Sequence, residues 1–193
     1  MLISLRDNLT GLFHFSGRTT RSGFWPYAVI VILLSMAGLI GVMIPSMVDM
    51  FVRMQRFAAQ HPELVTEIRG PGSYEMRIEG YHPELMPNFG SLFLEMGGVA
   101  LGAILLLAAA VTRRLHDRDK SGWWALPPPV FLAIGFALMP YMFARFSREA
   151  PDMRLFFLLF FNNLTYLATL LLLVILLLGP GSSGPNRYGE QPD

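Results

Sequence analysis

The sequence predicts an all-α integral membrane protein, a bundle of about four transmembrane helices preceded by an N-terminal interfacial helix. The 193-residue chain is 53% hydrophobic and only 15% charged, with a mean hydropathy of +0.45. Soluble domains carry about 25% charged residues. The hydrophobic residues gather in four stretches, and each has the roughly 20 residues that crossing a bilayer requires. We therefore treat residues 1–193 as a single membrane domain.

Composition also excludes several classes of site and partner. The net charge of +1 gives no support to nucleic acid binding. The absence of cysteine excludes disulfides, iron–sulfur clusters, thiolate zinc sites and cysteine nucleophiles. Residues 1–20 contain Arg6, Asp7 and Arg18 without a continuous apolar core, so no cleavable signal peptide is expected. The expected partner is the lipid bilayer, and no cofactor is expected.

The first element is a short helix lying in the membrane interface. Its apolar residues recur at helical spacing, whereas Arg6, Asp7 and Asn8 fall elsewhere. The apolar set is Leu2, Leu5, Leu9, Leu12 and Phe13. The alternative is ordinary disorder at the chain end.

Four spans are expected at 24–48, 89–112, 123–144 and 155–178. Between the first two lies a polar extramembrane insertion, 49–88, in which the breakers His61-Pro62, Gly70-Pro71-Gly72 and His82-Pro83 predict a short helix, a turn and irregular chain. The polar tail, 179–193, is turn-rich and is expected to be loosely ordered.

The third span contains Pro127, Pro128 and Pro129. Proline in a helix interior removes an N–H donor and restricts the preceding residue. An extended entry followed by a helix from Pro129 is therefore expected. Because such a helix is only about 24 Å long, at 1.5 Å per residue, three spans plus a re-entrant segment are the alternative to four full spans.

Polar and small residues inside the spans allow two interpretations each. Gly98 and Gly102 have the G-x-x-x-G spacing of close helix packing, although glycine is also common in membrane helices. Glu95 lies near the start of its span, where it can reach water or serve an ion path. In the fourth span a polar stripe on one face predicts contact with protein, or a substrate path: Asn162, Thr165, Tyr166 and Thr169.

The segment RRLHDRDKSGWW at 113–124 connects the second and third spans. Arginines at a helix C-terminus are favoured by the helix dipole, and Trp123 and Trp124 suit a membrane–water boundary. If the helix continues one turn, Asp117 comes within pairing distance of Arg113 and Arg114. These basic residues directly flank two spans, so we expect the N-terminus and the 113–122 hairpin to face the cytoplasm.

Sharper interpretations of this hairpin remain open. His116 beside Asp117 suggests a general base, but neighbours on a helix point about 100° apart. A metal site would need His116, Asp117 and Asp119, with His14 from the N-terminal segment. The interpretation preferred over both is anchoring, followed by recognition of lipid or protein, and no catalytic or metal-binding residue is assigned.

Three motifs, FSGRTTRSGFW at 15–25, RRLHDRDKSGWW at 113–124 and GPNRYG at 184–189, resemble the signatures of the domain of unknown function 805 family. The resemblance implies a small bacterial inner-membrane protein of unestablished activity, in a family whose compact members place about three spans. Segments 49–88 and 145–178 then look like insertions. The signature positions implied are Gly17, Arg18, Arg21, Phe24, Trp25, Arg113, Arg114, His116, Asp117, Ser121, Gly122, Trp123, Trp124, Asn186, Arg187, Tyr188 and Gly189.

The function expected from the sequence is that of a non-enzymatic membrane component that scaffolds or recognises a partner membrane protein or anionic lipid headgroups. A small transporter or channel subunit, and an enzyme or metal site at His116 and Asp117, are the alternatives. The candidate recognition cluster comprises Arg18, Arg21, Arg113, Arg114, His116, Asp117, Ser121, Trp123, Trp124, Asn186 and Arg187.

Overall fold

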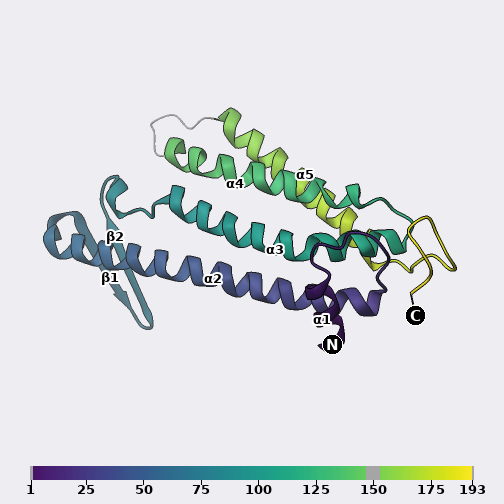
Figure 1. The fold of residues 1–193 in the computed structure, drawn as a ribbon. Coiled ribbons are helices and arrows are strands. Elements are labelled where there is room, and N and C mark those ends of the chain that lie inside the picture. The colour runs from purple at the N-terminus through teal and green to yellow at the C-terminus, as the bar shows by residue number, and fades with distance from the viewer. Residues whose placement is uncertain (1, 147–152, 193) are drawn as a thin grey trace.

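The computed structural model describes residues 2–146 and 153–192, and it places four long helices side by side (Figure 1). These are α2 (Arg21–Gln60), α3 (Phe89–Asp117), α4 (Pro127–Phe146) and α5 (Met153–Leu178). Each is long and apolar enough to cross a membrane. The prediction of a largely helical protein is confirmed, and so is the presence of four helices long and apolar enough to span a membrane.

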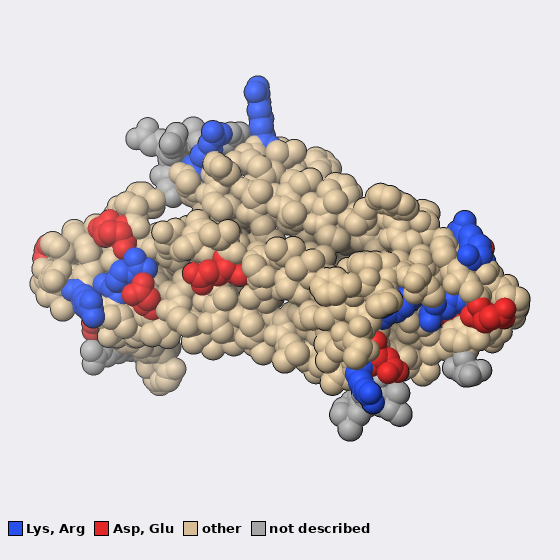
Figure 2. Space-filling model, viewed as in Figure 1, with Lys and Arg blue, Asp and Glu red and all other residues tan. Residues whose placement is uncertain are grey.

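The two ends of the bundle differ in content. The short helix α1 (Leu2–Thr10), the connection between α3 and α4 and the C-terminal tail lie at one end, whereas a β-hairpin lies at the other (Figure 1). Charged side chains gather towards both ends, and a band that is almost free of charge separates them (Figure 2). We call the end that holds both termini the terminal end of the bundle.

Helix α2 is longer than the sequence predicted. It begins where the side chain of Thr20 accepts a hydrogen bond from the Gly23 N–H at 3.2 Å. Its 40 residues extend about 60 Å, roughly twice the thickness of the hydrocarbon core. The helix ends at Gln60 because His61 precedes Pro62, and a residue before proline disfavours helical backbone. Residues 49–60, which the sequence placed in the extramembrane insertion, continue this helix, so the predicted first span and the short helix expected after it form one element.

A β-hairpin occupies half of the remaining insertion, where a turn and irregular chain were expected. Strands β1 (Val65–Gly70) and β2 (Ser73–Ile78) pair antiparallel, and Gly72 supplies the positive φ of 79° in the turn. The four-residue sequence HPEL occurs on both sides of the hairpin, and its last three residues form the 3-10 turns η1 (Pro62–Leu64) and η2 (Pro83–Leu85).

Helix α3 ends in the turn that the sequence predicted. Asp119 adopts a left-handed backbone conformation with φ of 54°. The N–H of Lys120 then donates to the carbonyl of Leu115 at 2.9 Å, and the N–H of Asp119 donates to the carbonyl of His116. This is the Schellman arrangement, in which a left-handed residue satisfies carbonyls at the end of a helix.

The start of α4 corrects the expectation for the three prolines. A 3-10 turn, η3 (Gly122–Ala125), leads directly into α4, whose first three residues are Pro127, Pro128 and Pro129. The first N–H groups of a helix have no partner within it, so proline costs little there. The helix is thus 20 residues, or about 30 Å, long, which removes the reason for a short or re-entrant third span.

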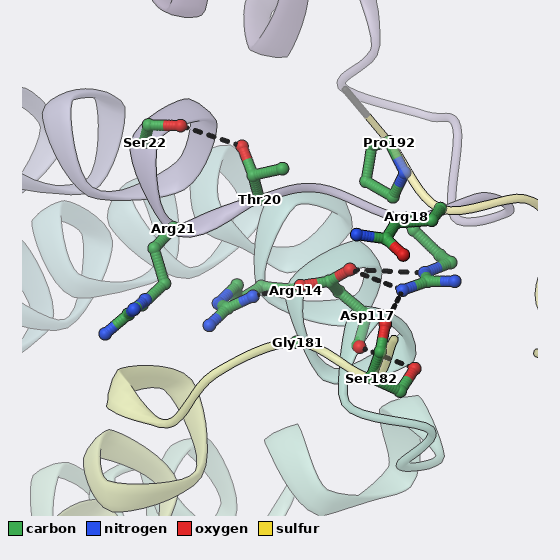
Figure 3. A pocket seen from close by; sticks show the side chains of 10 residues that line it. Arg18, Thr20, Arg21, Ser22, Arg114, Asp117, Gly181, Ser182 and Pro192 are labelled. Carbon is green, nitrogen blue, oxygen red and sulfur yellow. Dashed lines mark hydrogen bonds and ion pairs between the residues drawn. The ribbon is translucent and has the colours of Figure 1, made fainter. Parts of the chain in front are cut away.

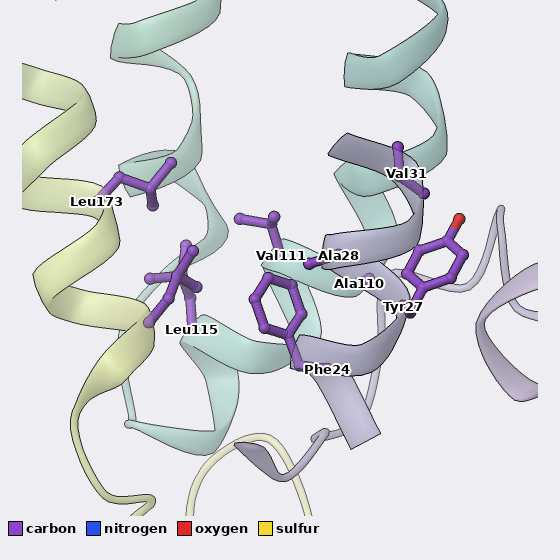
Figure 4. Packing of buried hydrophobic residues seen from close by; sticks show 9 residues of the cluster. Phe24, Tyr27, Ala28, Val31, Ala110, Val111, Leu115 and Leu173 are labelled. Atoms are coloured by element: carbon purple, nitrogen blue, oxygen red, sulfur yellow. The ribbon is translucent and has the colours of Figure 1, made fainter. Parts of the chain in front are cut away.

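The hydrophobic core lies near the terminal end, where α2, α3 and α5 meet (Figure 4). Its largest apolar members are Phe24 and Tyr27 of α2 and Leu115 of α3, all at most 2% exposed. The Tyr27 hydroxyl donates to the Leu106 carbonyl of α3 at 2.8 Å. This packing fixes the first turns of α2 against the last turns of α3.

Helix α1 docks on the start of α2. The Ser4 hydroxyl and the Asn8 amide both donate to the Gly23 carbonyl, at 2.5 and 3.0 Å. Asn8 is buried, which corrects its expected place away from the packed face, whereas Leu9 and Phe13 are exposed. Leu9 of α1 and Phe13, which follows the helix, therefore leave exposed apolar side chains for the membrane interface.

Candidate functional site

The site is built around Asp117, in the last turn of α3. One carboxylate oxygen accepts two hydrogen bonds from Arg18, from Nε at 3.1 Å and from Nη2 at 3.0 Å. The other oxygen accepts a hydrogen bond from Arg114, one turn earlier on the same helix. The side chains of Arg18 and Arg114 are 1% and 0% exposed, so this triad is an internal feature of the fold.

Three arginines bind the C-terminal end of α5. The last carbonyls of a helix lack partners within it, and they carry the negative end of its dipole. Arg118 donates to the carbonyls of Ile175 and Leu176, Arg114 to those of Leu177 and Gly179, and Arg21 to that of Leu178. This arrangement lets an apolar helix end inside the protein with its carbonyls satisfied.

Arg113 binds the N-terminal segment instead. Its guanidinium donates to the Gly11 and His14 carbonyls and, at 2.8 Å, to the side-chain oxygen of Asn8. Its Nε donates to the Thr19 hydroxyl at 3.3 Å. All of these acceptors are neutral, and Arg113 is only 9% exposed.

The tail is held against the same residues. The Ser182 N–H donates to the Asp117 carbonyl at 2.7 Å, and the Asn186 amide donates to the His116 carbonyl at 3.0 Å. Arg18 also donates to the Ser182 and Gly184 carbonyls. The expectation of a loosely ordered tail is wrong for these residues, because backbone and side-chain bonds tie them to the end of α3.

The two acidic groups and the histidine of the proposed metal or catalytic site face different partners. His116 stacks on Tyr188, with ring centroids 3.7 Å apart. Asp117 binds arginines, and Asp119 pairs with Arg187 at 3.1 Å. Over residues 2–146 and 153–192, no three His, Asp or Glu side chains converge as metal ligands would. In these contacts the His116 ring and the Asp117 carboxylate bind different residues and do not pair with each other.

Three members of the candidate cluster lie outside this network. Ser121 caps η3, accepting a hydrogen bond from the Trp123 N–H at 3.4 Å. Trp123 and Trp124 are 76% and 48% exposed. Their exposure at the end of a hydrophobic bundle fits the membrane boundary.

A cavity of about 450 Å³ opens beside the network (Figure 3). Its charged lining consists of Arg18, Arg21, Arg114 and Asp117, an excess of two positive charges. Figure 3 shows Arg21 and Arg114 extending towards the end of α5, while Arg18 reaches Asp117 from the other side. Arg21 is exposed and makes one long bond, 3.3 Å, to the Leu178 carbonyl. Among the described residues, it is the cavity arginine with the most unused donors.

Three of the four residues of the polar stripe on α5 bond to protein carbonyls. Asn162 is buried and donates to the Phe131 carbonyl of α4 at 3.0 Å, whereas Thr165 and Thr169 bond to carbonyls of their own helix. Around Gly98 and Gly102, no described atom lies within 4 Å of where a side chain would begin. Glu95 lies on the outer face of α3.

The family model described as "Protein of unknown function (DUF805)" matches residues 12–190. The chain belongs to the DUF805 family. The matched range encloses 49–88 and 145–178, which the sequence suggested as insertions. No curated protein and no solved structure matches the chain significantly. Arg18, Arg114, Asp117 and Asn186, four of the positions that resemble DUF805 signatures, meet in one network although they come from both ends of the chain and its middle.

Sequence reasoning missed several contributors to the site. Arg118 and Ser182 belong to the network, and Asn8 receives Arg113. Arg118 lies inside the motif at 113–124, whereas Ser182 and Asn8 precede the other two motifs, and a lone asparagine or serine carries no signal of long-range contact. Arg118 repeats the i, i+4 spacing of Arg114, which places both on one face of α3. That spacing was the available signal.

Proposed function

We propose that this chain is a non-enzymatic, multi-pass protein of the bacterial inner membrane, and that its terminal end recognises an anionic partner membrane protein or anionic lipid headgroups. The observation that carries the proposal is the cavity, which is lined by three arginines and one aspartate; of these arginines, Arg18 and Arg114 bind the aspartate. Desolvated positive charge without a matching carboxylate favours a negatively charged ligand. Arg21, with unused donors, is the residue best able to bind it.

The expected orientation of the chain in the membrane also supports recognition of an anionic partner at the terminal end. Arg18, Arg21, Arg113 and Arg114 flank the ends of α2 and α3, where basic residues favour the cytoplasmic side. The cytoplasmic leaflet is the more anionic one, and each Lys or Arg near such a surface contributes about 1 kcal/mol of attraction. Arg113 and Arg114 are buried and their donors bind the protein itself, so we assign the recognition role expected of them to the exposed Arg21.

The proposal is tested by crosslinking in native membranes and by measuring the lipid that co-purifies, across a salt series. The variant is Arg21→Gln, and the control is Arg6→Gln, which removes an exposed arginine of α1 at the same end. We expect Arg21→Gln alone to lose salt-sensitive anionic lipid or a crosslinked partner. Equal retention by the parent and both variants would remove the proposal.

A further inference from the structure

We propose that the cavity is a phosphate-binding site, in which Arg21 contacts the phosphate with the hydroxyls of Thr20 and Ser22. This inference rests on the proposed function and names the chemistry of its ligand. A phosphate group offers several strong acceptor oxygens, and a guanidinium donates to two of them in parallel. Free phosphate and the phosphate of a lipid headgroup share this chemistry.

The division of donors among the arginines is the first argument. Arg18 and Arg114 each donate from Nε and both Nη atoms to groups of the protein itself. Arg18 makes five such bonds and Arg114 four, so the two supply fixed positive charge and at most one uncommitted N–H, on Arg114. Arg21 makes only its bond to the Leu178 carbonyl among the described residues. A ligand is thus attracted by a net charge of two and contacted mainly by one arginine, Arg21.

Hydroxyl groups provide the second argument. The hydroxyls of Thr20 and Ser22 lie 3.0 Å apart, and both line the cavity. One of them donates to the other, which leaves the second proton free to reach a ligand oxygen. The third hydroxyl of the lining, that of Ser182, already donates to the Asp117 carbonyl at 3.2 Å. Arginine with clustered hydroxyls is a donor set for an acceptor-rich anion and leaves an apolar or cationic ligand without partners.

The position of the cavity gives the third argument. Arg21 is the first residue of α2, and the apolar helix α5 ends at Leu178, to which Arg21 donates. Exposed Trp123 and Trp124 follow the end of α3, and such rings prefer the membrane–water boundary. The cavity therefore lies where the apolar spans end, which is the depth of the lipid phosphates.

The lipid arm of the test uses purified full-length protein in nanodiscs. One preparation contains phosphatidylcholine alone, one adds phosphatidylglycerol, and one adds oleate, an anion without phosphate. Retention is measured by native mass spectrometry for the parent, Arg21→Gln, Arg21→Lys and the control Arg6→Gln. We expect the parent and control to retain phosphatidylglycerol, and both Arg21 variants to bind it about tenfold more weakly, which corresponds to about 1.4 kcal/mol.

The second arm measures thermal unfolding in neutral detergent with millimolar inorganic phosphate. Retained phosphatidylglycerol without stabilisation by phosphate identifies the lipid as the source, and stabilisation that depends on Arg21 identifies free phosphate. Equal retention of oleate and phosphatidylglycerol overturns the phosphate assignment and leaves anion recognition standing. If the protein retains neither oleate nor phosphatidylglycerol and inorganic phosphate does not stabilise it, both the phosphate site and the proposed anion recognition are overturned. Unchanged unfolding of Arg21→Gln without ligand shows that the variant folds.

Discussion

Arg113 and Arg114 are adjacent in the chain, yet they bind opposite ends of it. Arg113 donates to Asn8, Gly11 and His14, and Arg114 donates to Leu177 and Gly179. Neighbouring residues on a helix point about 100° apart, so one arginine faces the N-terminal segment and the other faces α5. The end of α3 thereby connects the beginning and the end of the protein.

This division predicts separate consequences for two similar substitutions. Arg113→Lys should release the N-terminal segment, and Arg114→Lys should release the end of α5 and the tail. Lysine keeps the charge, but its single ammonium group cannot reproduce the several fixed directions of a guanidinium. Hydrogen exchange in detergent should show faster exchange over residues 8–19 in the first variant and over 177–186 in the second. The same pattern in both variants would mean that the network opens as one unit.

Gly181 provides a test of the contact between the tail and Asp117. A Cβ atom added at Gly181 would meet the Asp117 carboxylate well inside van der Waals contact. Gly181→Ala should therefore displace the tail or the carboxylate and lower the free energy of unfolding by about 1–3 kcal/mol. The readout is thermal unfolding in detergent.

Gly98→Ala is the matched control, because no described atom lies within 4 Å of an added Cβ there. Within a helix this change should be neutral or stabilising by up to about 1 kcal/mol. A loss of stability at Gly98 equal to that at Gly181 would show that the outer face of α3 has a partner.

The four helices could be predicted because a long apolar run in a membrane protein has few stable structures other than a helix. Four spans of alternating direction also predict that both termini and the 113–122 hairpin lie at the same end. The β-hairpin also had a signal: the β-branched residues Val65, Thr66 and Ile68 come just ahead of a Gly-Pro-Gly turn. No signal in the sequence predicted that the arginines would be buried. An arginine after an apolar helix suits the lipid headgroups or the carbonyls of another helix equally well, and only the packing of α5 beside α3 decides between them.

Asn162 should matter more than the other polar residues of α5. Asn162→Leu removes the bond to the Phe131 carbonyl of α4 and should destabilise the bundle by about 0.6–1.7 kcal/mol. Thr165→Val should cost less, because Thr165 donates to Phe161 on its own helix. Thermal unfolding of the two single variants in detergent compares them. Equal losses would assign the stripe a packing or transport role beyond this one bond.

Side-specific labelling tests the orientation, and the chain suits it because it contains no cysteine. Ser73 is exposed in the β-hairpin, and Lys120 is exposed in the turn after α3, at the opposite end of the bundle. Ser73→Cys should react with an impermeant maleimide in intact cells, whereas Lys120→Cys should react only after permeabilisation. Lys120 is preferred to Ser121, because Ser121 caps η3.

Three outcomes of this labelling have distinct meanings. The expected pattern places Arg21 and its cavity at the cytoplasmic leaflet, where anionic lipid gathers. The reverse pattern would put the cavity at the outer leaflet and contradict the inference from flanking arginines. Reaction of both cysteines from one side would mean that α3 does not cross the membrane, although its 29 residues extend about 43 Å. A topology reporter fused after residue 192 should agree with Lys120, because the tail is bound to Asp117 at the same end.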